Sequence, residues 1–433
     1  MKTLPPTAVT AQGCYIYDKS GKPYLDGSGG AAVSCLGHGD PDIIAAIKEQ
    51  ADQLSFAHTG FFTSEPAEEL TELLIKHAPG ELDRVYLVSG GSEAAEAAIK
   101  LARQFHIENG QPERQHLIAR KQSYHGNTLG ALAAGGNEWR RKQFSPLLIN
   151  VSHISPCYEY ILREETETAY EYGQRMAQEL EDEILRLGPE TVMAFMAEPV
   201  VGATLGAVPA VDGYFQKIRK ICDQYGVLLI LDEVMCGMGR TGHLYACDAE
   251  QVSPDILCIA KGLGAGYQPI GAMLCTSEIY QCIETGSGLF QHGHTYLGHP
   301  VAAAVGLKTL EIYEREKIFE KVGPLGVHFQ RALQSFADHP LVGEARGVGM
   351  IGACELVTNK STKGVFDPVG KAGLYCAARC HANGLVVRAI GDVIAFCPPL
   401  IVSDDEVGEI FERFGRSLDE TLDWAAREGL LSS

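Results

Sequence analysis

The stretch Leu87–Lys100, LVSGGSEAAEAAIK, places an apolar run directly before Gly90-Gly91-Ser92 and an amphipathic helix directly after these residues. Glycines let a ligand approach the backbone closely, and the first turn of a helix offers unpaired N–H groups at the positive end of the dipole. The stretch therefore predicts a strand, a turn and a helix that can bind an anion such as phosphate. A plain turn with Ser92 as N-cap explains the same residues, so both interpretations stay open here.

Short apolar runs alternate with amphipathic stretches on both sides of this segment. Arg84–Ser89 is a strand candidate, and further apolar runs lie at Val192–Ala197 and Val227–Leu231. The stretch between the last two predicts a helix opened by Asp212 and closed by Gly226. This alternation is typical of an α/β protein in which helices cover a mainly parallel sheet.

The two ends of the chain carry different patterns. Tyr15–Asp26 (YIYDKSGKPYLD) predicts a hairpin, and Asp40 is the expected N-cap of the helix that follows. Near the other end, Ser403 and Glu406 have the spacing of a capping box at the start of the last helix. The ends are therefore expected to fold into regular structure of their own.

An aspartate and a lysine follow two of the apolar runs. Asp232 ends the run VLLILDE (Val227–Glu233), and ligands of open parallel sheets gather at the carboxyl ends of strands. Between Asp255 and Glu278, Lys261 is the only charged residue. Apolar surroundings lower the pKa of a lysine and make its amine nucleophilic, as Schiff-base chemistry requires. Taken singly, Asp232 could cap a turn and Lys261 could be a surface lysine.

The composition narrows the classes of function. The 433 residues have a formal net charge of −19, which argues against nucleic acid as the main partner. The 13 cysteines include no Cys-x-x-Cys pair and predict free thiols in a reducing cytoplasm. No signal peptide and no membrane helix are expected. We therefore expect a cytoplasmic protein with two or three domains.

Two further sequence patterns give only weak support for a binding site. Gly237–Gly242 (GMGRTG) has the spacing of a dinucleotide-binding motif, but no amphipathic helix follows it. His292, His294 and His299 lie close together without a zinc-like spacing or a nearby carboxylate. We expect neither a dinucleotide site nor a metal site.

Six motifs, taken in order, resemble the class-III (ω-type) aminotransferases of the fold-type-I enzymes that use pyridoxal 5′-phosphate (PLP). They are SGGSEAAEAAIKLAR, SYHGNTLGAL, AEPVVGA, LDEVMCGMGRTG, AKGLGAGYQPIGA and HGHTYLGHP, and the resemblance extends from about Gly13 to Leu400. It implies a large domain with a mainly parallel seven-stranded sheet and a smaller α+β domain built from both chain ends. We expect residues 1–55 to form the N-terminal segment of the small domain, 56–320 the large PLP-binding domain and 321–433 the rest of the small domain.

The resemblance also implies roles for individual residues in holding the cofactor. Lys261 would carry PLP as a Schiff base and move the proton, and Asp232 would bind the pyridine nitrogen. The residues expected near the rest of the cofactor are Gly91 and Ser92 at the phosphate, Val234 and Tyr124 of the Tyr124-His125-Gly126 motif on the two ring faces, and Glu198 near the ring hydroxyl. Thr295 would reach the phosphate of the neighbouring subunit, which implies a homodimer, possibly a tetramer.

The resemblance implies fewer residues for substrate recognition than for cofactor binding. Val386–Asp392 (VVRAIGD) resembles the amine:pyruvate subgroup, in which Arg388 would clamp a carboxylate with its planar, bidentate guanidinium. Ala32 stands where several relatives of that subgroup carry a tryptophan, which leaves part of the pocket to Phe61 and Phe62. His294 replaces the usual phenylalanine before the phosphate threonine. These departures concern the substrate and leave the chemistry unchanged.

The resulting hypothesis is a ping-pong transamination from an amine or ω-amino acid to a keto acid, with pyruvate as the expected acceptor. PLP-dependent decarboxylases, aminomutases and racemases share the scaffold and remain the alternatives within this chemistry. A non-catalytic binding protein is a further alternative, which the presence of both Lys261 and Asp232 disfavours.

Overall fold

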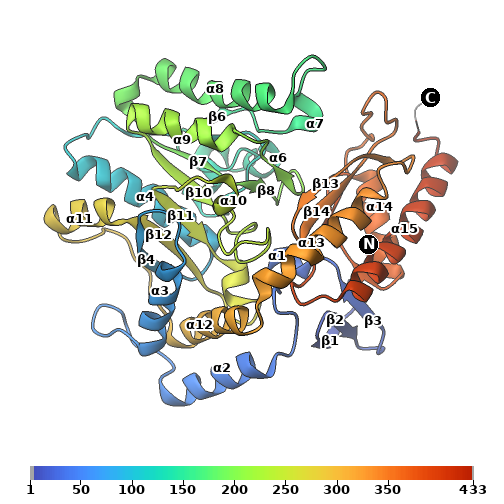
Figure 1. Cartoon of the computed structure of the whole chain (residues 1–433), viewed down its shortest axis with the longest axis horizontal. Coiled ribbons are helices and arrows are strands. Elements are labelled where there is room, and N and C mark those ends of the chain that lie inside the picture. Colours follow the sequence, from blue (N-terminus) through green and yellow to red (C-terminus); the bar gives the residue numbers. More distant parts are fainter. Residues whose placement is uncertain (1–3, 432–433) are drawn as a thin grey trace.

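The computed structural model describes residues 4–431, and its centre is a seven-stranded sheet (Figure 1). The strand order is β4-β12-β11-β10-β7-β5-β6, and β12 alone runs antiparallel to its neighbours. The strands are β4 (Leu82–Val88), β5 (His116–Arg120), β6 (Ser152–Ile154), β7 (Val192–Ala197), β10 (Leu228–Asp232), β11 (Ile256–Ile259) and β12 (Gly271–Thr276). The expected α/β fold with a mainly parallel sheet is confirmed.

Both faces of this sheet are buried, because successive residues of its strands enter different cores. In β10, Leu229 and Leu231 pack into one hydrophobic cluster while Leu228 and Ile230 pack into another. A strand covered on both sides needs an unbroken apolar sequence rather than an alternating one. This requirement explains the run of five apolar residues before Asp232.

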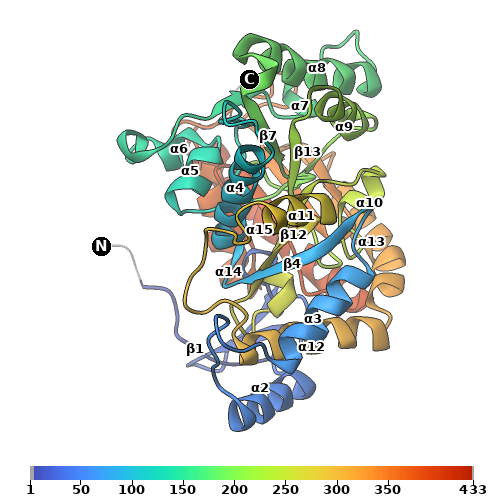
Figure 2. The ribbon, with the colours of Figure 1, turned by 90° about the vertical axis from the view of Figure 1, so that its left-hand side faces the viewer.

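Helices cover the two faces of the sheet, and Figure 2 shows α4 and α11 in front of it. The helices of this region are α3 (Glu65–Lys76), α4 (Gly91–Glu108), α5 (Leu129–Ala134), α6 (Glu138–Arg141), α7 (Glu159–Leu162), α8 (Ala169–Leu187), α9 (Tyr214–Tyr225), α10 (Cys247–Glu250), α11 (Ser277–Thr285) and α12 (Pro300–Arg315). Short 3₁₀ turns lie at η1 (Ser145–Leu147), η2 (Pro189–Thr191) and η3 (Lys261–Gly264), and a two-stranded ribbon joins β8 (Val200–Val201) to β9 (Val208–Pro209).

The helix expected between β7 and β10 begins later than predicted. Gly213, with a φ of 84°, precedes the first residue of α9, so Asp212 is not the N-cap. The left-handed backbone at this position favours a glycine, which offers no capping side chain in the sequence. The closing residue was predicted correctly, because Gly226 ends α9 with a φ of 62°.

Two further four-stranded sheets lie outside the central one, and the two ends of the chain meet in the first of them. One sheet has the order β1-β2-β3-β15, and its last strand lies parallel to β3, with Leu385 opposite Leu25. The other has the order β13-β14-β17-β16 and is antiparallel. Their strands are β1 (Ala8–Gln12), β2 (Tyr15–Asp18), β3 (Pro23–Asp26), β13 (Val342–Val348), β14 (Ile351–Leu356), β15 (Leu385–Val386), β16 (Arg388–Ile390) and β17 (Val393–Phe396).

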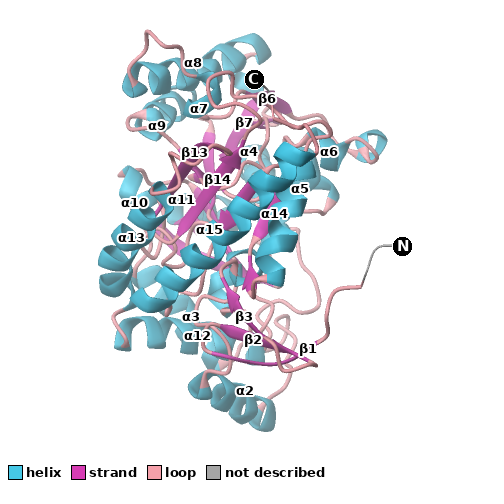
Figure 3. Ribbon diagram, turned by 90° about the vertical axis from the view of Figure 1, so that its right-hand side faces the viewer, coloured by secondary structure: helices cyan, strands magenta, loops and turns pink. Residues whose placement is uncertain are grey.

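Helices α14 and α15 pack beside these sheets, as Figure 3 shows from the right-hand side of the molecule. The helices outside the central region are α1 (Gly29–Ala32), α2 (Pro41–Gln53), α13 (Ile318–Gln334), α14 (Lys371–Ala382) and α15 (Asp404–Arg427). Two predicted helix starts are confirmed: Asp40 accepts from two N–H groups of α2, and Ser403 and Glu406 form a capping box on α15. The predicted hairpin is also confirmed, since β2 and β3 pair antiparallel.

Two further observations concern the state of the cysteines and the length of the helices. All 13 cysteines are free, and all but Cys282 are buried. Among residues 4–431, no helix is long and apolar enough to cross a membrane.

Candidate active site

A cavity of about 230 Å³ lies at the carboxyl ends of five parallel strands of the seven-stranded sheet. Strands β4, β5, β7, β10 and β11 all end at or just before residues of its wall. The wall consists of Val33, Ser89, Gly90, Gly91, Ser92, Tyr124, His125, Gly126, Glu198, Ala203, Asp232, Val234, Met235, Ala260, Lys261, Gln268, Pro269 and Ile270. Open α/β sheets place their ligands at this edge.

Lys261 follows β11 by two residues and starts the 3₁₀ turn η3. Its φ of 45° is in the left-handed region, which a side chain other than glycine rarely adopts. Burial lowers the pKa of its amine, while the negative charge of Asp232 acts in the opposite direction. Among residues 4–431 the amine has no hydrogen-bond or ion-pair partner, so it is free to react with a ligand in the cavity.

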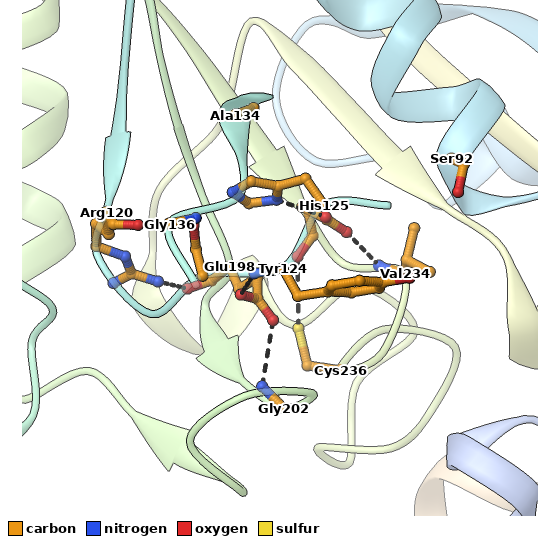
Figure 4. Close-up of polar contacts among 12 residues, drawn as sticks. Ser92, Arg120, Tyr124, His125, Ala134, Gly136, Glu198, Gly202, Val234 and Cys236 are labelled. Atoms are coloured by element: carbon orange, nitrogen blue, oxygen red, sulfur yellow. Dashed lines mark hydrogen bonds and ion pairs between the residues drawn. The ribbon is translucent and has the colours of Figure 1, made fainter. Parts of the chain in front are cut away.

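Asp232 ends β10 and is 4% exposed. One carboxylate oxygen accepts from the backbone N–H of Val234 at 3.0 Å, and the other lies 2.8 Å from Nδ1 of His125. Figure 4 labels His125 and Val234, the two residues that hold this carboxylate. An N–H on Nδ1 of the imidazole and the backbone N–H together orient an ionised carboxylate at the cavity wall.

The first turn of α4 faces the same cavity. Gly90 occupies the N-cap position, and no side chain caps the helix. Ser92 is instead bound to Asn127, since its hydroxyl lies 3.0 Å from Oδ1 and accepts from the backbone N–H at 3.1 Å. The interpretation of Ser92 as N-cap is therefore wrong, and N–H groups of the first turn stay available to an anion.

Two glycines let the backbone approach neighbouring side chains at this end. A Cβ on Gly91 would lie 2.7 Å from Cγ1 of Val234, and a Cβ on Gly126 would lie 2.7 Å from Oγ of Ser92. Neither distance is compatible with a side chain in this backbone position. Gly91 therefore lets α4 approach the segment that follows Asp232, and Gly126 lets the loop that carries Tyr124 approach the start of α4.

Glu198 follows β7 and is 3% exposed. Its carboxylate accepts from the backbone N–H groups of Tyr124 at 3.0 Å and Gly202 at 3.2 Å, as Figure 4 shows. Burial raises the pKa of this carboxyl, and the charge of His125 opposes the shift. The contacts join the loop that carries Tyr124 to the ribbon that begins at β8, so Glu198 fixes this part of the cavity wall.

The donor set fits PLP. It combines a partnerless amine, an oriented carboxylate, a helix start that can bind phosphate and two side chains, Tyr124 and Val234, that can pack against a flat ring. A second observation supports this fit. The buried Nε2 atom of His125 has no hydrogen-bond partner among the described residues. Within residues 4–431, no group of three or more His, Cys, Asp or Glu residues is placed to hold a metal ion.

The cavity brings together most of the residues predicted from the sequence. Gly91, Ser92, Tyr124, His125, Glu198, Asp232, Val234 and Lys261 all line it. Sequence reasoning assigned no role to Val33, Ser89, Met235 or the turn Gln268-Pro269-Ile270, which line it too. That turn lies within the quoted motif AKGLGAGYQPIGA, so its place just before β12 was the signal that could have identified it.

The other predicted residues lie away from the cavity wall of this chain. Thr295 is exposed in the loop between α11 and α12, and Phe61 and Phe62 are 81% and 69% exposed. Ala32 is buried against a small apolar cluster, and its neighbour Val33 reaches the cavity instead. Arg388 is half-buried on β16, and its positive charge adds to burial in lowering the pKa of Lys261.

Comparisons with known proteins agree with one another. A family model described as "Aminotransferase class-III" matches residues 2–418. An uncharacterized aminotransferase of Schizosaccharomyces pombe is 41% identical over 96% of this chain and 93% of its own length. A putrescine–pyruvate aminotransferase of Pseudomonas aeruginosa is 38% identical over 95% of this chain and 90% of its own. The crystal structure of an omega transaminase from Pseudomonas jessenii in complex with PMP superposes with a TM-score of 0.95, at 37% identity, over 98% of this chain and 94% of that one.

Proposed function

The chain belongs to the class-III aminotransferases and is a PLP-dependent transaminase, and from this premise we propose that it moves an amino group from an amine or ω-amino acid to pyruvate by a ping-pong mechanism. One observation carries the proposal. Asp232 ends β10, Lys261 follows the adjacent parallel strand β11, and both line the same cavity as the uncapped start of α4. The name of the putrescine–pyruvate relative supports an amine donor with pyruvate as acceptor.

When bound, PLP supplies an electron-poor ring that accepts the electron pair left when a proton leaves the amine-bearing carbon. In our proposal, the Lys261 amine would hold the cofactor, and its Nζ would take that proton and give it back. Burial lowers the pKa of this amine, so a larger share of it is neutral and able to accept a proton near pH 7. The Asp232 carboxylate binds the ring nitrogen and favours its charged form.

The remaining residues bind and orient. The backbone N–H groups of Gly91 and Ser92 hold the phosphate, and Tyr124 and Val234 pack against the two faces of the ring. His125 orients Asp232, and Glu198 lies near the ring hydroxyl. These assignments follow the family's pattern and are supported by the position of all these residues on one cavity wall.

Substrate and partner contacts complete the proposal. Arg388 binds the carboxylate of the keto acid, and Phe61, Phe62 and Ala32 shape the space for the rest of the substrate. We propose a homodimer in which Thr295 of one subunit reaches the phosphate site of the other. The exposure of Thr295, Phe61 and Phe62 in the single chain supports such an interface.

A panel of donors tests this function. Purified protein loaded with PLP is mixed with one amine at a time and pyruvate, and the carbonyl product and alanine are quantified. The proposal expects equal amounts of the two products and, without pyruvate, a single turnover that leaves the cofactor as its amine. Release of carbon dioxide or inversion of the donor without alanine would favour one of the other PLP-dependent activities.

A further inference from the structure

Two arginines near the cavity keep their guanidinium N–H groups free of hydrogen bonds and ion pairs within the described residues. Arg140 on α6 and Arg388 on β16 are both half-buried. Among residues 4–431, neither guanidinium makes a hydrogen bond or an ion pair. Arg141, which follows Arg140 in the sequence, does have an ion-pair partner: its guanidinium lies 3.0 Å from the carboxylate of Glu138 on the same helix. A guanidinium that is partly removed from water and left unpaired gains free energy when an anion pairs with it.

Arg140 is held beside the cavity by Tyr124. The guanidinium carbon of Arg140 lies 4.7 Å from the centre of the Tyr124 ring, which lines the cavity wall. A second ring, that of Trp139, lies 5.8 Å away. The contact with Tyr124 fixes the cation without using its N–H donors, which remain free in the plane of the guanidinium.

The two arginines act on the same region. The positive charge of Arg140 adds to burial in lowering the pKa of Arg388, and the charge of Arg388 in turn lowers the pKa of Lys261. The carboxylates in this region are already engaged, since Asp232 is bound to His125 and Glu198 accepts from two backbone N–H groups. Neither of these carboxylates pairs with Arg140 or Arg388, so both guanidinium groups keep N–H donors for an anionic ligand.

We propose that Arg140 is a specificity-determining residue that binds a carboxylate at the end of the substrate remote from the reacting amine. This inference rests on the proposed function and narrows its donor class to ω-amino acids, with the amine at Lys261 and the carboxylate beyond Tyr124. A diamine of the same length would bring a second ammonium group next to two guanidinium groups, so it is a poor donor.

Three donors of equal chain length test the inference: δ-aminovalerate, pentylamine and cadaverine, each with pyruvate. Arg140→Gln raises the KM for δ-aminovalerate about 10- to 100-fold, the effect of losing one charge-assisted pair. The KM for pentylamine stays within about twofold, which also shows that the variant is folded, and the KM for cadaverine falls. The control Arg141→Gln leaves all three unchanged.

A binding measurement separates this inference from the proposed function. Glutarate, which cannot react, is titrated calorimetrically into the PLP-loaded protein, and its affinity falls about tenfold or more in Arg140→Gln and stays unchanged in Arg141→Gln. Equal glutarate affinity in wild type and Arg140→Gln, or an equal rise in KM for δ-aminovalerate and pentylamine, would overturn the inference. If the wild type turned over no donor, the proposed function would be refuted. The glutarate titration would then still test whether Arg140 binds a carboxylate.

Discussion

At the scale of single residues, the environment of Lys261 determines its reactivity. The lysine is the only charged residue between Asp255 and Glu278, and the strand before it, β11, is fully buried. Removal from water lowers the pKa of the amine, and Asp232 opposes this shift without pairing with the amine. Asp232 is bound to His125 and to the backbone of Val234, so its position does not depend on the lysine. The two groups can therefore serve different atoms of one ligand.

Replacing Asp232 with Asn tests this division of roles. The amide keeps the shape of the side chain but not its charge, so PLP stays bound while proton removal slows by about 10²-fold or more. The absorbance of the cofactor reports binding, and stopped-flow kinetics of the donor half-reaction report the proton step. Asp223→Asn, at an exposed position on α9, is the control. A variant with near-normal rates would show that the carboxylate does not support the reaction.

At the scale of elements, the junction between β4 and α4 was predicted closely from the sequence. The apolar run, the glycine pair and the periodic alanines after them each require one local structure, and β4 and α4 begin and end near the expected residues. The N-cap was wrong, because Ser92 binds Asn127, a contact with a residue 35 positions away. Local patterns predict elements, whereas contacts between distant segments decide which polar group a hydroxyl binds.

Gly91→Ala tests the importance of this junction. The new methyl group would lie 2.7 Å from Cγ1 of Val234, so α4 or the segment after Asp232 has to move. We expect the affinity of the apoprotein for PLP to fall about tenfold or more, together with a loss of about 1–3 kcal/mol in the free energy of unfolding. Fluorescence titration with PLP measures the affinity, and urea denaturation measures the free energy of unfolding.

The matched control is Gly408→Ala in α15, where a Cβ would meet no atom within 4 Å. This substitution should leave PLP affinity unchanged and stabilise the helix slightly. If Gly91→Ala bound PLP as tightly as Gly408→Ala, the close approach of α4 to Val234 would not matter for the cofactor site.

At the scale of the whole molecule, the sequence predicted the fold class but only part of the site. Lys261, Asp232 and the start of α4 were identified because each directly follows or precedes a strong local pattern. The pairing of Leu385 with Leu25 could not be read from either segment alone, since it depends on how the two chain ends pack. Phe61 and Phe62 were expected at the substrate pocket, but both are exposed in the single chain, and their place there stays a prediction.

The free energy of unfolding should depend on pH through one partly buried carboxyl group, that of Glu250. Burial and the charge of Asp212 raise the pKa of Glu250 to about 7, from an ordinary value of 4.5. Between these two values the folded state holds a proton that the unfolded state has released, so stability falls as the pH rises through this window. Above pH 7 the folded state contains a poorly solvated negative charge.

Glu250→Gln removes this charge and keeps the size of the side chain. The carboxylate makes no hydrogen bond within residues 4–431, so little else is lost. The variant should melt about 2–4 °C above the wild type at pH 8 and at nearly the same temperature at pH 4.5, measured by scanning calorimetry. Glu320→Gln, at an exposed position, is the control. A gain of equal size at both values of pH would contradict the assignment.

The attachment of PLP to one lysine amine is the central claim, and chemical trapping tests it most directly. The PLP-loaded protein is reduced with borohydride, digested and analysed by mass spectrometry, which locates the cofactor as a stable adduct on a peptide. We expect a single labelled site at Lys261, and no adduct at the native level in Lys261→Ala. A label on another lysine in the wild type, or an undiminished label in Lys261→Ala, would contradict the account.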